Sequence, residues 1–551
     1  MRKLITKYRF QLSLGLIWLL LRIVINPMGE FPINDDWAYA HNTQALSEEG
    51  VYSFSFWPAM TLIAQTFWGA LFSKMFGFSL FNLRMATMAM AIIGSLFFFA
   101  LLKRETKNEK LSFLLTVALL ANPFFISLSF TYMTEIYYLT FAGISFYFIS
   151  RILRGEKWSD WVFLLIFVLL TVLVRQTGLI FTIAFALAYV LAKPIKIKRV
   201  LLSIVPFIVA FLGLEIYKHL RMEVDPNLGS LSEVGDLFRA ISDISWGYIL
   251  ERVGLIFFYL GLMLTPVSLL LFSRLREPLN TKKILYVAFV LVPILICMFT
   301  TWPLFPWGNL LGNFELGPRL LKDTGLFGTN MATPLPELIW QVIRLISVVS
   351  VSVFVYSLYS IVESKQAEGT LWSRCITAVR LHPFAFMLGA IIAAQCVYIV
   401  INPIFFDRYV LPMMFTGLLL VGVLFNHAKK LNWRISIALT SVFLIVSSLM
   451  TRDLMSWYGA RLTATNYLQF EMGISPSQLD GGFEFNAYHK VAGFNPTPVK
   501  TTDKSWWFVK EDKFLLTNGD FEGYRKVKGF PTNQWISTSA DSVYIMEKIE
   551  P

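Results

Sequence analysis

Long apolar runs separated by short charged segments dominate this chain. A helix needs about 20 apolar residues to cross a bilayer, and most of the runs approach or exceed that length. The pattern predicts a polytopic α-helical membrane protein with about thirteen transmembrane helices. The predicted spans lie near residues 10–27, 85–102, 111–128, 136–150, 160–174, 177–192, 200–214, 253–272, 284–300, 338–361, 384–401, 409–425 and 435–451.

Lysines and arginines gather in short clusters between these runs, and the clusters give the orientation. They lie around residues 2–9, 103–110, 151–157, 193–199, 274–283, 365–380 and 429–434. With thirteen spans, every cluster falls on the same side of the membrane. Because basic residues are enriched on the cytoplasmic side, we expect a cytoplasmic N-terminus and an extracytoplasmic C-terminus.

Residues 58–76 are apolar enough to form another span. A span there would move every later basic cluster to the outer side, which the charge distribution argues against. We therefore predict a helix that lies in or re-enters the outer interface, started by Pro58. It belongs to a long first outer loop, residues 28–84. The other substantial outer loops are predicted at residues 215–252 and 301–337, with a short one at 402–408.

The composition changes after Thr451, where short aromatic runs alternate with turn signals such as Asn518-Gly519-Asp520. Such a pattern is typical of strands joined by tight turns. We predict two domains: a transmembrane domain at residues 1–451 and a small extracytoplasmic α/β domain at 452–551. About a hundred residues are enough to bury a core.

Composition excludes several classes of function. Charged residues make up 15% of the 551 residues and hydrophobic residues 56%, whereas about a quarter of a soluble chain is charged. The net charge of +12 arises from the clusters that set the topology, so we expect membrane lipids and no nucleic acid as partners. The three cysteines and five histidines show no disulfide or metal spacing. We expect no metal or other cofactor, although the carboxylates leave a divalent cation possible in principle.

Two adjacent carboxylates, Asp35 and Asp36, follow the first span in a polar stretch of the outer loop. One of them could cap a helix that begins at Trp37, with Gly50 ending it. A pair of neighbouring acids can also keep one carboxylate basic enough to accept a proton. Capping and catalysis are both open, and we favour Asp36 as the base with Asp35 as its neighbour and possible cap.

Three more charged residues interrupt apolar sequence on the predicted outer side. Glu135 lies in a short connection, around residues 123–135, so it must sit near the membrane surface and face protein or a cavity. Arg175 ends the fifth span and Arg408 precedes the twelfth. Arg175 could simply snorkel toward the surface, and Arg408 could simply end a helix. Alternatively, either arginine could bind a phosphate.

Further candidates come from the neighbourhood of these residues. Arg84 and Lys74, near the end of the first outer loop, are possible phosphate ligands. The predicted substrate contacts are Trp37, Tyr39, Gln176 and Tyr409. The sequence has no glycine-rich phosphate loop, no Ser/His/Asp set and no cytoplasmic nucleotide-binding domain. A group transfer on the outer side would therefore use a lipid-linked donor.

Several short motifs occur in a characteristic order along nearly the whole chain. They are DDWAYA (35–40), GFSLFNLR (77–84), NPFF (122–125) with TYMTEIYY (131–138), VRQTG (174–178), DRYVLP (407–412) and GGFEFNAY (481–488). This ordered set resembles membrane glycosyltransferases of the GT-C type, in the bacterial superfamily of protein mannosyltransferases and aminoarabinose transferases. The span count and the outer C-terminal domain are similar to those of the aminoarabinose transferases.

The resemblance implies an inverting transfer of a sugar from a polyprenyl-phosphate donor, on the outer face of the bacterial inner membrane. It implies an acidic base in the first outer loop, at the position of Asp35-Asp36. The chain departs from the family at Asp36, where Glu is common, and at Glu135, where Asp is usual. The soluble β-trefoil domain of protein mannosyltransferases is missing, which favours a glycan or lipid acceptor over a protein.

Other functions would use the same composition differently. A transporter or flippase for a lipid-linked saccharide would place ionisable groups near the membrane midplane and often carries internal repeats. An oligosaccharide ligase or polymerase would use diphosphate-linked chains. A purely structural membrane protein would leave the outer acids and arginines unexplained. The position of the acids in outer loops favours the monosaccharide transferase.

Overall fold

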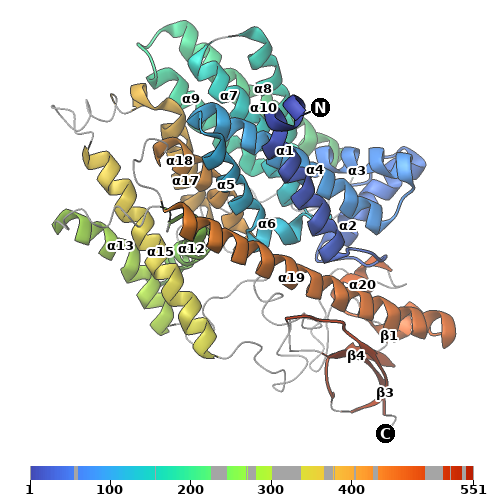
Figure 1. Ribbon diagram of the computed structural model, residues 1–551. Coiled ribbons are helices and arrows are strands. Elements are labelled where there is room, and N and C mark those ends of the chain that lie inside the picture. The colour runs from blue at the N-terminus through green and yellow to red at the C-terminus, as the bar shows by residue number, and fades with distance from the viewer. Residues whose placement is uncertain are drawn as a thin grey trace.

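The computed structural model describes residues 2–54, 57, 60–155, 157–224, 245–268, 270, 281–300, 337–364, 377, 379–402, 405–425, 432–489, 513–521, 523–536 and 541–549. Figure 1 shows a bundle of long helices with a small sheet at one end. The helices of the bundle are α1 (Arg2–Ile25), α2 (Asp36–Gln44), η1 (Ala45–Glu49), α3 (Ile63–Phe76), α4 (Leu80–Thr106), α5 (Glu109–Leu120), α6 (Pro123–Leu128), α7 (Thr134–Arg154), α8 (Trp158–Val172), η2 (Gln176–Gly178), α9 (Leu179–Leu191), α10 (Ile197–Val224), α12 (Trp246–Ser268), α13 (Thr281–Thr300), α15 (Glu337–Ser364), α17 (Pro383–Ile401), η4 (Asp407–Val410), α18 (Leu411–Phe425) and α19 (Trp433–Asn466). The C-terminal part adds η5 (Tyr467–Glu471), η6 (Pro476–Gln478), β1 (Leu479–Asp480), α20 (Phe483–Tyr488), β2 (Phe514–Thr517), β3 (Tyr524–Pro531) and β4 (Ser542–Lys548).

The helices confirm the predicted class of protein. In the described part of the chain, eight helical segments are long and apolar enough to cross a membrane, and four shorter apolar helical segments accompany them. Large apolar side chains are exposed along their outer faces, as on α1, where Leu12, Leu16, Leu19 and Ile23 repeat at helical spacing. In a lipid environment such faces are solvated by hydrocarbon. Every predicted span contains a helix, while the exact count of thirteen stays a prediction.

Two predicted segments differ from the observed helices. The span predicted at 111–128 is broken into α5 and α6 at Asn122, whose Oδ1 accepts hydrogen bonds from the N–H groups of Phe124 and Phe125 at 2.8 and 3.1 Å. Pro123 fits the first turn of α6 because that position needs no N–H donor. The outer loop predicted to start at residue 215 instead begins with the last turns of α10, which continues to Val224.

The first outer loop is helical and compact. The helix α3 begins at Ile63, after Leu62 in the left-handed region (φ 59°), and so later than the predicted start at Pro58, which lies outside the described residues. One face of α3 is apolar and exposed at Phe67 and Leu71, as an interfacial helix requires. Its other face packs on α2 and α4.

The C-terminal part is a four-stranded sheet with the strand order β1-β2-β4-β3. The strand β1 pairs parallel to β2, while the other pairs are antiparallel. The helix α19 packs against β3 and β4 and also against α1 within the bundle. The domain boundary predicted after Thr451 therefore falls inside one continuous helix that is shared by the bundle and the sheet (Figure 1).

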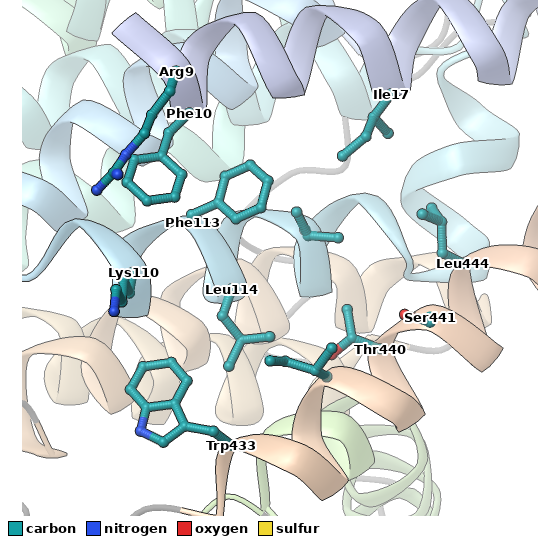
Figure 2. A pocket seen from close by; sticks show the side chains of 12 residues that line it. Arg9, Phe10, Ile17, Lys110, Phe113, Leu114, Trp433, Thr440, Ser441 and Leu444 are labelled. Atoms are coloured by element: carbon teal, nitrogen blue, oxygen red, sulfur yellow. The ribbon is translucent and has the colours of Figure 1, made fainter. Parts of the chain in front are cut away.

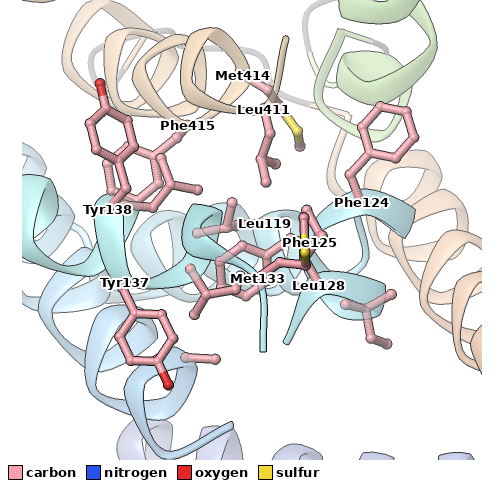
Figure 3. Close-up of a cluster of buried hydrophobic side chains, with 14 of the residues drawn as sticks. Leu119, Phe124, Phe125, Leu128, Met133, Tyr137, Tyr138, Leu411, Met414 and Phe415 are labelled. Carbon is pink, nitrogen blue, oxygen red and sulfur yellow. The ribbon is translucent and has the colours of Figure 1, made fainter. Parts of the chain in front are cut away.

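Large buried side chains from α5, α6, α7 and α18 meet in one cluster (Figure 3). Its labelled members are Leu119, Phe124, Phe125, Leu128, Met133, Tyr137, Tyr138, Leu411, Met414 and Phe415. Met133 and Tyr137 flank Glu135 in the sequence, and Leu411 follows Arg408 by three residues. The cluster therefore fixes the helix starts that carry these two charged residues, because close-packed interiors hold their elements rigidly.

Candidate active site

The two carboxylates at the start of α2 have different surroundings. Asp36 is 1% exposed, and its carboxylate accepts hydrogen bonds from the backbone N–H groups of Ile33 (2.6 Å) and Tyr132 (3.4 Å). It therefore ties the loop before α2 to the segment before α7. Burial raises the pKa of Asp36 to about 7, and the two backbone hydrogen bonds and the Arg84 guanidinium oppose that rise.

Asp35 occupies the N-cap position of α2, yet its side chain makes no capping hydrogen bond. Its Oδ1 accepts a hydrogen bond from Nε1 of Trp57 at 3.0 Å, and its Oδ2 lies 3.4 Å from Nη2 of Arg408. The side chain is 23% exposed. The predicted end of the helical segment at Gly50 is confirmed, with Gly50 in the left-handed conformation (φ 73°) after η1.

Glu135, in the first turn of α7, is buried between two arginines. Its Oε1 lies 3.0 Å from Nη1 of Arg175 and 3.3 Å from Nε of Arg408. The Arg175 side chain comes from the break between α8 and η2, and Arg408 comes from η4. We name Asp35, Glu135, Arg175 and Arg408 the charged cluster. Four segments that are far apart in the sequence thus meet at one end of the bundle.

The charged cluster is balanced, with two carboxylates against two guanidinium groups. Burial makes such an arrangement costly unless each charge is paired, so the geometry of every member depends on the others. Tyr39 lies close enough to interact electrostatically with all four members. The ring of Tyr409 lies 5.5 Å from Cζ of Arg175. Gln176 follows Arg175 directly and is half-buried.

Two predicted phosphate ligands lie elsewhere. Arg84 is buried in α4, where Nη1 donates to the carbonyl oxygen of Phe31 at 2.7 Å and Nη2 to that of Gly29. Its guanidinium also lies over the Phe31 ring, 4.4 Å from the centroid. It therefore secures the loop before α2. Lys74 is exposed in the last turn of α3.

The C-terminal part covers the helix that follows Asp35. Phe483, at the start of α20, packs on Trp57 and Trp37 with ring centroids 5.6 and 6.2 Å away. His41 stacks on Tyr488, at the end of α20, with the centroids 5.1 Å apart. The sequence motif GGFEFNAY points to α20 but does not predict its contact with Trp57, because nothing local links residues so far apart.

A buried ion pair anchors α20 to α19. Arg461 Nη1 lies 3.1 Å from Oε2 of Glu484, and Arg461 Nε donates to the carbonyl oxygen of Gly481 at 2.7 Å. Tyr458 donates to Oε1 of Glu484 at 2.9 Å, and its ring stacks on Phe31 with the centroids 5.3 Å apart. The loop before α2 is thus held by α4 on one side and by α19 on the other.

The acids of this site are paired with arginines and with backbone N–H groups. Among the residues that the structure describes, no three or more His, Cys, Asp or Glu side chains are grouped so as to hold a metal ion. The expectation that no cofactor takes part stays a prediction.

Part of the chain matches a known protein family. Residues 64–219 match the family model of dolichyl-phosphate-mannose-protein mannosyltransferases. The family resemblance is confirmed over that segment. The matched segment includes Glu135 and Arg175, while Asp35 and Arg408 lie outside it.

The chain also aligns with a solved structure, the crystal structure of ArnT from Cupriavidus metallidurans bound to undecaprenyl phosphate. That alignment has a TM-score of 0.45 and 10% sequence identity, and covers 98% of this chain and 97% of that chain. No curated protein sequence matches the chain.

Proposed function

We propose that this protein is a membrane glycosyltransferase that moves a sugar from a polyprenyl-phosphate donor to a glycan, lipid or protein acceptor on the outer face of the bacterial inner membrane. The observation that carries the proposal is the charged cluster, in which the partly exposed carboxylate of Asp35 contacts Arg408, and Arg408 and Arg175 both contact the buried Glu135. The match of residues 64–219 to a mannosyltransferase family supports the same chemistry.

Asp35 is the better general base of the two adjacent acids. A base must touch the hydroxyl that it deprotonates, and Asp35 is 23% exposed, whereas both oxygens of Asp36 lie within hydrogen-bonding distance of backbone N–H groups. The sequence favours Asp36, so the proposal moves the base by one residue. Asp36 then acts as the buried clamp that positions its neighbour.

The reaction is a single displacement. The acceptor hydroxyl attacks the anomeric carbon, the bond from that carbon to the phosphate oxygen breaks, and the electron pair leaves with the polyprenyl phosphate. The transition state has oxocarbenium character. The proton of the hydroxyl passes to the carboxylate of Asp35, and the configuration at the anomeric carbon inverts.

Arg408 and Arg175 stabilise the leaving phosphate. The donor is a phosphate diester with one negative charge, and the departing monoester gains another. At the same step Asp35 takes up a proton, so the charged cluster changes from neutral to singly positive. Positive charge therefore appears next to the leaving group as its negative charge grows. Fixed charges that strengthen only in the transition state raise kcat.

The first experiment measures sugar transfer by the full chain in vesicles, with a bacterial membrane extract as the source of both polyprenyl-phosphate sugars and acceptors. Release of polyprenyl phosphate is the readout, and undecaprenyl phosphate binding is measured in parallel. Asp35→Asn is expected to lower turnover by about 10²–10⁴-fold while binding persists. Asp36→Asn is the variant for comparison: its amide oxygen can still accept the hydrogen bond from Ile33 that holds the loop, so it is expected to keep most of the turnover. Full turnover by Asp35→Asn would overturn the assignment of the base, and wild-type protein that consumes no donor would overturn the function.

A further inference from the structure

A pocket of about 590 Å³ opens between α1, α5 and α19, well away from the charged cluster. Figure 2 shows the side chains that line it. Arg9 lies in the same helix as Ile25, roughly 24 Å away along the axis at about 1.5 Å per residue. The charged cluster begins beyond Ile25, so the pocket belongs to the opposite, predicted cytoplasmic side of the membrane. Ligand pockets typically have volumes of about 300–1,000 Å³.

The walls of the pocket are apolar and its basic side chains are exposed. Phe10 and Phe113 pack with ring centroids 5.0 Å apart, and the remaining apolar lining is Ile17, Leu114, Val117, Trp433, Ile437 and Leu444. Arg9 and Lys110 are exposed at this end of α1 and α5. The residues that line the pocket in the described part of the chain include two cations and no acid. Glu109 lies next to Lys110 in the sequence but pairs with Lys103.

Thr440 supplies an independent sign of a ligand. Its side chain lines the pocket and is 2% exposed, and Oγ1 has no hydrogen-bond partner among the described residues. A buried hydroxyl without a partner costs about 1–3 kcal/mol in general, so such groups usually meet a ligand or water. Ser441, beside it, also lines the pocket (Figure 2).

We propose that this pocket binds an anionic phospholipid of the cytoplasmic leaflet. One acyl chain lies along Ile17, Leu114 and Leu444, the headgroup phosphate lies between Arg9 and Lys110, and a glycerol ester carbonyl accepts the hydrogen bond of Thr440. The pattern of exposed cations above an apolar groove between membrane helices complements such a lipid in both charge and polarity. A zwitterionic lipid would bring its own cation to the same two side chains and would bind more weakly.

The test uses the full-length protein in detergent and native mass spectrometry. Phosphatidylglycerol and phosphatidylcholine with the same acyl chains are titrated separately. We expect the wild type to retain one phosphatidylglycerol more tightly than phosphatidylcholine. Each cation near a membrane surface contributes about 1 kcal/mol, so Arg9→Gln and Lys110→Gln should each weaken phosphatidylglycerol binding roughly fivefold.

Two further variants separate this pocket from general lipid coating. The control Lys157→Gln/Lys196→Gln removes the same charge from the same predicted side, away from the pocket, and is expected to bind like the wild type. Thr440→Val keeps the side-chain shape, loses no hydrogen bond within the described chain, and is expected to weaken binding of both lipids severalfold. Ser441→Phe should exclude the acyl chain.

Several results would overturn the proposal. The wild type could retain the two lipids equally. The Arg9→Gln/Lys110→Gln double variant and its control could lose the same amount of phosphatidylglycerol affinity. Ser441→Phe could bind phosphatidylglycerol as tightly as the wild type does. Loading by undecaprenyl phosphate in preference to phosphatidylglycerol would also overturn it, because the occupant would then be a polyprenyl lipid. The gel-filtration profile and circular dichroism of every variant must match those of the wild type.

Discussion

Nη2 of Arg408 lies 3.4 Å from Oδ2 of Asp35, although 373 residues separate the two in the chain. The same guanidinium reaches Oε1 of Glu135 through Nε at 3.3 Å. The buried side chain of Arg408 therefore connects the partly exposed carboxylate of Asp35 to the buried carboxylate of Glu135. Substitutions at these positions should affect donor binding, stability and turnover differently, because the side chains differ in burial.

Replacing Arg408 should weaken donor binding, whereas replacing Lys74 should not. Hydrogen bonds to charged groups contribute about 1.5–3 kcal/mol, so Arg408→Gln should raise the Kd for undecaprenyl phosphate roughly 10–150-fold. Lys74 is exposed in the last turn of α3 and is not a member of the charged cluster, so Lys74→Gln serves as the control. Equal affinities of the two variants would remove Arg408 from the phosphate site.

Glu135→Gln should destabilise the protein more than Asp35→Asn. Glu135 is fully buried between two guanidinium groups, and removal of one partner from a buried ion pair costs about 3–5 kcal/mol. Asp35 is partly exposed, so water compensates its loss. Thermal unfolding in detergent measures both variants. Glu135→Asp keeps the charge and should recover part of the loss; a Gln variant as stable as the wild type would contradict this account.

The buried carboxylate of Asp36 should make stability depend on pH. Its pKa is about 7 in the folded protein, against 3.8 for the unconstrained group. The folded state therefore holds the proton over a range in which the unfolded state has lost it, so stability falls as pH rises from about 4 to about 7. The total change is on the order of 4 kcal/mol.

Asp36→Asn should flatten that dependence, because the amide oxygen can still accept the Ile33 hydrogen bond without carrying a charge. The check is the difference in Tm between variant and wild type at pH 5 and at pH 8. We expect the Tm of the variant to rise relative to the Tm of the wild type as pH rises from 5 to 8. A constant difference across this range would show that Asp36 does not titrate on folding.

Phe483→Ala should lower kcat with little change in donor affinity. Phe483 packs on Trp57, and Trp57 donates to Asp35, so removing the ring loosens the carboxylate without touching either arginine. Small misplacements of a reacting group can cost about 10²-fold. Phe470, which is 80% exposed, provides the control Phe470→Ala. If the Kd for the donor rose while kcat stayed unchanged, Phe483 would instead have a direct role in donor binding.

Gly69→Ala should disturb the first outer loop. A Cβ at Gly69 would lie 2.8 Å from Cζ of Tyr132 and closer still to its hydroxyl, which interacts with Thr43 at 2.8 Å and donates to the carbonyl oxygen of Gln65 at 3.1 Å. Overpacking of this kind typically costs about 1–3 kcal/mol. Gly15 has no neighbour within 4 Å of such a Cβ, so Gly15→Ala should leave the Tm unchanged or raise it. Similar Tm values for the two variants would contradict the clash.

The membrane fold and the four residues of the charged cluster could be predicted from the sequence. Apolar runs mark spans because the bilayer imposes their length, and basic clusters assign sides, so the sequence alone places Glu135, Arg175 and Arg408 on one face. Hydropathy and charge could not assign different roles to the neighbouring acids Asp35 and Asp36. Their roles depend on the hydrogen bonds that the backbone N–H groups of Ile33 and Tyr132 donate to Asp36. Hydropathy does not predict such hydrogen bonds.

Other differences between the predicted and the observed structure also have specific physical causes. The position of Arg84 at the end of the first outer loop suggests a phosphate ligand, yet its guanidinium donates to the carbonyl groups of Gly29 and Phe31. The sequence does not predict that α19 continues past Thr451, because polar residues begin at Arg452. The helix leaves the bundle there and meets the sheet. A change in composition marked the change in surroundings but not the end of the helix.

The long separation of Asp35 and Arg408 also sets an order of events during biosynthesis. At a synthesis rate of about 5–20 residues per second, the 373 residues from the one after Asp35 to Arg408 take roughly 20–75 s to appear. Until then Asp35 lacks Arg408, and the inner face of α1 lacks α19. We therefore expect the nascent chain to depend on the insertion machinery, or on a chaperone in the membrane, to shelter its first helices until the last ones are made.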